Sequence, residues 1–277
     1  MLRLNVDELQ ELQAICEQHD QIDLKLNWDM LLNPEEDNSL HLVEYREGRL
    51  IAFLGKYVIG GSMEICGMVH PDFRRQGIFT RLLKNGITRE EATKYSSILL
   101  NTLAASASGQ AFLKTVSCSY SFTEYQMQYV ATENKLSSVR PGISLRTATQ
   151  EDAVLLSQLD EDGFQCNYEQ TLQDFERLSP KDMAENELII ADGQIVGKIR
   201  VSRLEERSWV YGFVIHSRYR GEGIGRAVLE QVIAREYAAG HSIWLDVAIE
   251  NPAAMKLYET AGFQLRSAQD YLTYVFA

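Results

Sequence analysis

A glycine-rich stretch in the second half of the chain has the residue types of an anion-binding turn. It follows an apolar run and consists of Arg220-Gly221-Glu222-Gly223-Ile224-Gly225. Glycines let a backbone approach a phosphate closely, and a helix that begins there presents unpaired N–H groups and the positive end of its dipole. The stretch matches neither the Walker A pattern nor the Rossmann glycine spacing. It predicts a pyrophosphate site, although a purely structural strand-to-helix turn would need the same glycines.

A second motif follows the next predicted strand, which covers residues 242–248. It runs from Asn251-Pro252 through Leu257-Tyr258 to Gly262-Phe263. Asparagine is a favoured helix N-cap and proline a favoured first helical residue. The motif therefore predicts a helix over 252–261 that begins directly after a strand.

The sequence around the first motif occurs twice in the chain. The segment 69–79 corresponds to the segment 215–225 at an offset of 146 residues. Hairpin signals recur as well, because Glu47-Gly48 and Asp192-Gly193 each separate two apolar runs and lie 145 residues apart. The repetition predicts two halves with the same order of elements.

A polar stretch without periodicity separates the halves and closes on Pro141-Gly142. It predicts a domain over 1–135, a linker over 136–142 and a second domain over 143–277. The second domain is predicted to be a mixed α/β sheet, antiparallel at one side, with one parallel pair joined by a crossover helix. Its expected strands cover 187–191, 194–202, 208–215, 242–248 and 263–276, and its expected helices cover 169–178, 223–238 and 252–261.

Together, the two motifs resemble those of the GNAT superfamily of acetyl-CoA-dependent N-acetyltransferases. They have the pattern Arg-x-x-Gly-x-Gly after a fourth strand and Asn-x-x-Ala-x-x-Leu-Tyr-x-x-x-Gly-Phe after a fifth. The resemblance covers 143–277 throughout and 1–135 more loosely. It implies two tandem GNAT-like domains, each a mixed, largely antiparallel six- to seven-stranded sheet flanked by helices.

The resemblance also implies a cofactor site and a catalytic residue in the second domain. Acetyl-CoA would be the co-substrate, and Tyr258 would be the general acid that protonates the departing thiolate, since a phenol keeps its proton at pH 7. A tyrosine simply packed at the sheet edge is the alternative. The implied cofactor-binding residues are Val214, Ile215, Arg220, Gly221, Gly223, Gly225, Arg226 and Asn251.

The general base and the acceptor side are less defined. Asp246 and Glu250 could accept the proton of the amine, but each could equally be a solvated side chain. His70 and His216 precede the two turns at equivalent positions, which indicates a requirement of the loop. By family analogy, the acceptor would be lined by Glu161, Asp162, Phe164 and Tyr168.

The first half departs from both motifs. Phe79 stands where the family has Gly or Ala, while Leu113 and Ser106 stand at the positions of Tyr258 and Asn251. We therefore expect a degenerate GNAT-like domain that shapes the groove, packs against its partner, or binds acetyl-CoA without turnover. Glu64 on its fourth strand could serve as a base or be an outward polar residue.

Composition excludes several classes of protein. The chain has 27 Lys and Arg against 39 Asp and Glu, a net charge of −12, which argues against a nucleic-acid partner. It has no apolar run long enough to span a membrane, and its first residues do not resemble a signal peptide. Its cysteines are scattered along the chain, and its histidines do not have the spacing of metal ligands. We therefore expect a cytoplasmic protein that neither crosses a membrane nor binds a metal ion.

The sequence thus predicts an N-acetyltransferase. An amine of a small molecule or peptide would attack the thioester directly, in the second domain, with backbone N–H near Ile215 stabilising the oxyanion. The excess of acids in 143–277, 21 against 13 basic residues, favours a cationic acceptor. A non-catalytic acyl-CoA-binding scaffold and a tandem GNAT synthase acting on a thiol precursor are the alternatives. The chain would be a monomer or homodimer.

Overall fold

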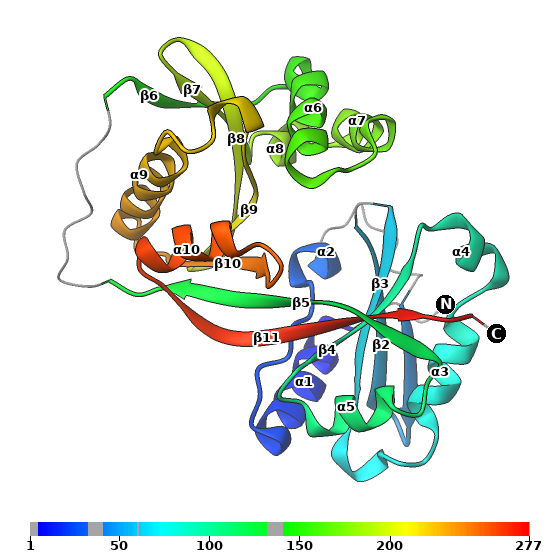
Figure 1. Ribbon diagram of the computed structural model, residues 1–277. Coiled ribbons are helices and arrows are strands. Elements are labelled where there is room, and N and C mark those ends of the chain that lie inside the picture. Colours follow the sequence, from blue (N-terminus) through cyan, green and yellow to red (C-terminus); the bar gives the residue numbers. More distant parts are fainter. Residues whose placement is uncertain (1–4, 33–40, 60, 132–140, 277) are drawn as a thin grey trace. The chain divides into compact units, whose positions relative to one another are not determined.

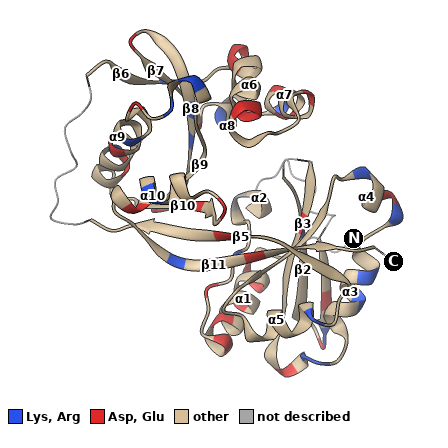
Figure 2. Cartoon of the chain, in the orientation of Figure 1, with Lys and Arg blue, Asp and Glu red and all other residues tan. Residues whose placement is uncertain are grey.

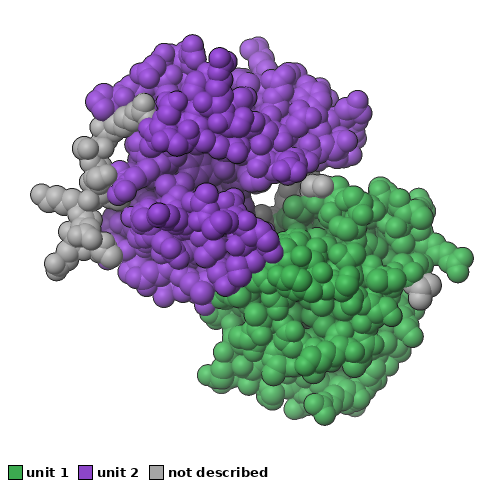
Figure 3. All heavy atoms as spheres, in the orientation of Figure 1, with its two compact units in different colours: residues 1–123, 267–277 green, residues 124–266 purple. Residues whose placement is uncertain are grey.

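The computed structural model describes residues 5–32, 41–59, 61–131 and 141–276 (Figure 1). It contains two compact units, coloured separately in Figure 3. Unit 1 comprises Met1–Thr123 with Ser267–Ala277, and unit 2 comprises Glu124–Arg266. Most of the predicted linker 136–142 lies outside the described residues. The predicted fold class, a mixed sheet flanked by helices in two GNAT-like halves, is confirmed.

Unit 2 has the predicted mixed sheet. Its strands lie in the order β5-β10-β9-β8-β7-β6, and β9 and β10 are parallel while their neighbours are antiparallel. The crossover helix α9 buries Val228 and Val232 completely against the sheet. The elements are β6 (Ile143–Thr147), α6 (Ala153–Phe164), α7 (Tyr168–Arg177), α8 (Pro180–Met183), β7 (Asn186–Ala191), β8 (Gln194–Leu204), β9 (Arg207–Ile215), α9 (Ile224–Ala238), β10 (Ser242–Ala248) and α10 (Pro252–Thr260).

Unit 1 repeats this arrangement. Its strands lie in the order β1-β2-β3-β4-β11, with β3 and β4 parallel and connected through α3 and α4. The elements are α1 (Val6–Asp20), α2 (Trp28–Leu32), β1 (Leu42–Arg46), β2 (Arg49–Ile59), β3 (Ser62–Val69), α3 (Ile78–Gly86), α4 (Arg89–Lys94), β4 (Ile98–Leu103), α5 (Ala107–Leu113) and β5 (Cys118–Tyr129).

Local sequence signals explain several element ends. Gly48 and Gly193 have φ of 78° and 79° in the two predicted hairpin turns, the left-handed region in which glycine is unstrained. Thr149 and Asp152 form a capping box before α6. Asn251 accepts a hydrogen bond from the backbone N–H of Ala254 at 3.1 Å and so caps α10.

The last strand of each half runs from its own unit into the other unit. The closing segment 263–276 forms one long strand, β11 (Phe263–Tyr274), whose residues Gln269–Thr273 pair with β4 of unit 1. Conversely, the end of β5, Glu124–Gln128, pairs with β10 of unit 2. Each unit therefore includes the end of the closing strand of the other half of the sequence, an exchange of terminal strands.

In each unit the parallel strands pair with one another only over their first residues. The β9–β10 register ends at Leu245 and Val210, although both strands continue. The β3–β4 register ends at Ile65 and Leu100, the equivalent positions 145 residues earlier. Each sheet therefore splits next to the turn that leads into the crossover helix.

Candidate active site

The glycine-rich turn of unit 2 exposes backbone at the start of α9. Gly221 and Gly223 have φ of 82° and 78°. A Cβ atom built on either glycine would have no heavy atom of the described residues within 4 Å, apart from the glycine itself and its two neighbours in the chain. No side chain in the described part of the chain caps α9. The N–H groups of its first turn therefore have no side-chain cap, which suits an anionic group.

Arg220 holds this turn in place with its side chain. Its Nε donates to the carbonyl of Ile215 at 2.8 Å, and its guanidinium pairs with Asp162 of α6 at 3.0 Å. Asp162 also accepts from the backbone and hydroxyl of Ser217. Burial opposes ionisation of Asp162, but the hydrogen bonds from Ser217 and the charge of Arg220 lower its pKa overall. The arginine of the motif thus positions the turn.

The same clamp is present in unit 1. Arg74 donates from Nε to the carbonyl of Val69 at 2.9 Å and pairs with Asp20 of α1 at 2.7 Å. The sequence did not reveal the two aspartates as partners, since each lies more than 50 residues from its arginine. A helix-terminal acid recurring in both halves is the signal that could have found them.

The two histidines before the turns have the loop role that their positions indicated. Nδ1 of His216 accepts from the N–H of Arg218, and Nδ1 of His70 accepts from the N–H of Asp72, each at 3.2 Å. Each histidine thereby caps a one-turn 3₁₀ helix that leads into the glycine-rich turn.

The two motifs of unit 2 meet at Gly225. A Cβ at that position would lie 3.5 Å from Cγ1 of Ile215 on β9 and 3.7 Å from Cδ2 of Leu257 on α10. Val214, next to Ile215, is 3% exposed and packs on α6, since a Cβ at Gly163 would lie 2.5 Å from its Cγ2. The end of β9, the turn and α10 therefore form one packed corner.

Tyr258 lies in this corner with its side chain in the core. It is 8% exposed, and its ring lies 5.9 Å from that of Phe263. Burial raises the pKa of the phenol to about 12, so the group is protonated at neutral pH. Tyr258 can thus donate a proton or a hydrogen bond, but it cannot act as a base there.

The other predicted residues are placed as follows. Arg226 pairs with Glu230 one turn later on α9, at 2.9 Å. Asp246 lies on β10 opposite Gln126 of β5, and Glu250 is exposed in the loop before α10.

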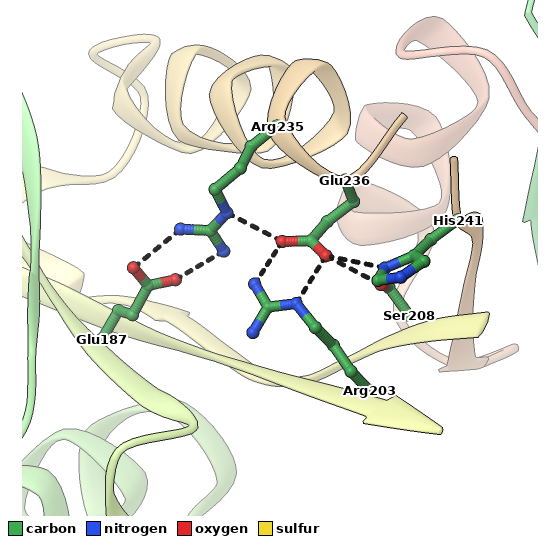
Figure 4. A network of polar contacts seen from close by, with 6 residues as sticks. All are labelled: Glu187, Arg203, Ser208, Arg235, Glu236 and His241. Atoms are coloured by element: carbon green, nitrogen blue, oxygen red, sulfur yellow. Dashed lines mark hydrogen bonds and ion pairs between the residues drawn. The ribbon is translucent and has the colours of Figure 1, made fainter. Parts of the chain in front are cut away.

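A buried carboxylate anchors the opposite end of α9. Glu236 is 1% exposed and is surrounded by Arg203, Arg235 and Ser208, with His241 beside it (Figure 4). Burial would raise its pKa, but the hydrogen bonds from these groups lower it to about 2. This network fixes the helix whose first turn forms the candidate anion site.

Comparison with known proteins identifies the family. A model described as the acetyltransferase (GNAT) family matches residues 4–115 and again 154–263. The chain belongs to this family. Members use acetyl-CoA as co-substrate, and the uncapped start of α9 with its open glycines fits the diphosphate of that molecule.

Three similar proteins illustrate the relationship. N-alpha-acetyltransferase RimI of Mycobacterium tuberculosis is 35% identical over 77 residues, 26% of this chain and 47% of the relative. Spermidine N(1)-acetyltransferase of Vibrio cholerae is 30% identical over 88 residues, 30% of this chain and 51% of the relative. The chain thus spans about half the length of the curated relatives it matches. A GCN5-related N-acetyltransferase structure from Sphaerobacter thermophilus shares the fold, with a TM-score of 0.77, 19% identity, and coverage of 96% of this chain and 91% of that one.

The described residues lack two further features. No helix within them is long and apolar enough to cross a membrane. They also contain no group of three or more His, Cys, Asp or Glu side chains that could hold a metal ion.

Proposed function

We propose that the chain transfers the acetyl group of acetyl-CoA to a primary amine of a small molecule or peptide, in unit 2. The observation that carries this proposal is the buried, protonated Tyr258 beside an intact glycine-rich turn. In unit 1, by contrast, the equivalent position is Leu113. Unit 2 is therefore the half that has a proton donor.

The cofactor would be held mostly by backbone. N–H groups of Arg220, Gly221, Gly223, Gly225 and Arg226 would bind its diphosphate, and Val214, Ile215 and Asn251 would bind its pantetheine arm. When bound, acetyl-CoA supplies an acetyl group activated as a thioester. The clamp between Arg220 and Asp162 keeps the turn ready to receive it.

Tyr258 would give its Oη proton to the thiolate sulfur as the C–S bond breaks. A phenol with a pKa of about 12 is a weak acid, but burial also raises the pKa of a thiol formed beside it. The transfer therefore stays feasible, and even partial donation stabilises the developing charge. The amine loses its proton to Asp246, Glu250 or water.

A cationic amine suits the acceptor side. All charged residues of α6 and α7 are acidic except Arg177 (Figure 2). Of these acids, Glu161 and Asp162 belong to the segment predicted to line the acceptor, and since Asp162 pairs with Arg220, Glu161 is the one we propose to meet the amine. A relative named for spermidine acetylation is consistent with such a substrate. The class of acceptor we propose is thus a polyamine or a peptide amine.

Replacement of Tyr258 by Phe tests the catalytic proposal. We expect kcat for a panel of polyamines and peptide amines to fall about 10²- to 10⁴-fold, while the Kd for acetyl-CoA changes by less than about threefold. The matched control is Tyr237→Phe, which alters an exposed tyrosine on α9. Unchanged turnover in Tyr258→Phe would overturn the role of this residue. Acetyl-CoA binding without turnover of any amine by the wild type would favour a non-catalytic scaffold.

A further inference from the structure

The last turn of α6 is attached to the cofactor side of unit 2 by several residues. Asp160 pairs with Lys198 of β8 at 2.5 Å, and Asp162 bonds to the segment that leads into the glycine-rich turn. Gly163 packs on β9, where a Cβ built on it would lie 2.5 Å from Cγ2 of Val214. The end of this helix is therefore fixed to the strands and the turn that are proposed to hold acetyl-CoA.

Asp162 makes the most specific of these attachments. Its Oδ2 accepts a hydrogen bond from the backbone N–H of Ser217 at 2.7 Å, and its Oδ1 accepts one from the hydroxyl of Ser217 at 2.6 Å. The guanidinium of Arg220 donates to Oδ2 at 3.0 Å and to the carbonyl of Asp162 at 3.3 Å. Hydrogen bonds between charged groups are stronger than neutral ones. A change in the position of the turn is therefore transmitted to the end of α6.

Unit 1 has this link in a more restrained form. Asp20 of α1 pairs with Arg74 through Oδ1 at 2.7 Å, and its Oδ2 accepts a hydrogen bond from the hydroxyl of Ser108 on α5 at 3.3 Å. The residue that corresponds to Ser108 in unit 2, 145 positions later, is Ala253 of α10. The side chain of alanine cannot donate a hydrogen bond, so the link in unit 2 responds to the turn without this additional restraint.

The residue next to Asp162 is the one proposed to meet the amine. Glu161 is exposed, whereas Asp162 is half-buried. Because consecutive residues of an α-helix point about 100° apart, fixing one side chain also fixes the direction of the next. The helix ends at Phe164, and α7 begins at Tyr168, so the connection between the two helices is short. The orientation of Glu161 and of this connection, both on the predicted acceptor side, therefore depends on the bonds of Asp162.

The link acts directly next to the candidate anion site. Ser217 and Arg220 precede Gly221 and Gly223 in the turn. A ligand favours one arrangement of a protein only if it binds that arrangement better than the others. A diphosphate needs several N–H groups to converge on it, so it should bind better when the bonds to Asp162 hold the turn in place.

We propose that Asp162 is a positioning residue that couples the two substrate sites of unit 2. When a diphosphate binds at the turn, the bonds to Ser217 and Arg220 hold the end of α6 in one orientation, which places Glu161 for a cationic amine. Coupling between two ligands is reciprocal, so the bound amine strengthens cofactor binding by the same factor, typically about 5- to 150-fold. The inference rests on the proposed function, from which it takes the cofactor and the acceptor side.

Coenzyme A alone tests the coupling without a known acceptor. Hydrogen exchange of the full chain is followed by mass spectrometry, with and without coenzyme A at concentrations that saturate each variant. In the wild type we expect exchange to slow about tenfold at 217–226, where the ligand is proposed to bind, and also at 161–168. In Asp162→Asn the slowing at 217–226 should persist, and that at 161–168 should fall below about twofold, because an amide cannot replace the charged pair with Arg220.

Two further variants calibrate this experiment. The matched control is Asp20→Asn, which removes the equivalent carboxylate from unit 1 and should leave the response of 161–168 to coenzyme A unchanged. Ser217→Ala removes the hydroxyl that bonds to Oδ1 of Asp162 but keeps the backbone N–H, so it should cause a partial loss of the response.

Steady-state kinetics gives a second readout with any amine that the wild type acetylates. In the wild type, the KM for the amine should fall about tenfold between low and saturating acetyl-CoA. In Asp162→Asn this dependence should disappear, while kcat at saturation with both substrates should change by less than about threefold. A residue with only a structural role would instead lower kcat or stability and leave the dependence of KM on acetyl-CoA intact.

Three outcomes would overturn the coupling. The first is a wild type in which coenzyme A slows exchange at 217–226 but not at 161–168, and the second is an Asp162→Asn variant that keeps the full response. The third, no slowing at 217–226 in the wild type, would overturn the proposed cofactor site as well. Undiminished turnover in Tyr258→Phe would overturn only the catalytic role of Tyr258 and would leave these exchange measurements unaffected.

Discussion

Because the terminal strands are exchanged, a substitution in one half of the sequence should destabilise the unit formed mainly by the other half. Tyr271 lies in the second half of the sequence but belongs to unit 1, where it is 1% exposed and stacks on Phe122 at 4.5 Å. Met127 lies in the first half but belongs to unit 2, where it is 2% exposed in the core. Truncating Tyr271 should therefore destabilise unit 1, and truncating Met127 should destabilise unit 2.

The expected effects are large. Replacing a buried aromatic residue by alanine costs about 3–5 kcal/mol, and the lost stacking with Phe122 adds to the upper end of that range. Replacing a buried methionine costs about 2–5 kcal/mol. Since a single domain is stable by roughly 5–15 kcal/mol, either change leaves the affected unit near its unfolding threshold.

Hydrogen exchange followed by mass spectrometry separates the two units. In Tyr271→Ala, amides of β2 and β3 should exchange about a thousandfold faster, from a loss of about 4 kcal/mol, while those of β8 and β9 change little. Met127→Ala should show the reverse. Gln264→Leu on β11 is the control, because that side chain is exposed.

The opposite pattern would refute the exchange. If Tyr271→Ala loosened β8 and β9 and left β2 and β3 protected, the last strand would belong to its own half of the sequence. The predicted contiguous domains, 1–135 and 143–277, would then describe the folding units.

Two further predictions concern buried charges of unit 2. The pKa of Glu236 falls from 4.5 to about 2 on folding, so this residue should contribute about 3 kcal/mol to the free energy of unfolding above pH 4.5. This contribution should disappear as the pH falls toward 2. Urea unfolding at several pH values should show the loss in the wild type but not in Glu236→Gln. Lys198 and Asp160 form a buried ion pair at 2.5 Å, so Lys198→Met alone should destabilise the protein by about 3–5 kcal/mol. In a double-mutant cycle, adding Asp160→Leu should recover most of the lost stability, and strictly additive effects of the two substitutions would contradict this prediction.

Local signals in the sequence predicted the elements well because their causes are local. Hairpin turns at Glu47-Gly48 and Asp192-Gly193 need left-handed residues, and the backbone there has them. The caps at Thr149 and Asn251 depend on side chains three residues from their partners. Such features need no knowledge of the rest of the fold.

The strand exchange could not be predicted for the opposite reason. The strands β4 and β10 offer similar edges, with Ile98 to Asn101 matching Ile243 to Asp246, and β5 and β11 are both strands of 12 residues. Either closing strand could pair with either edge, because strand pairing depends on backbone hydrogen bonds that all residues except proline supply. Long-range contacts, such as the hydrogen bond from Gln110 to Asp270 at 2.8 Å, specify the observed choice.

The turn of unit 1 shows why a single departure from a motif is a weak reason to exclude a binding site. Taken alone, Phe79 in place of a glycine predicts an obstructed turn. Its effect depends on the facing residue of β3, and Gly67 leaves room for the ring, as Gly225 does for Phe213 in unit 2. Close-packed cores tolerate substitutions that conserve total volume. Leu113 has no such compensation: if Tyr258 is the proton donor, as proposed, the equivalent position of unit 1 offers none.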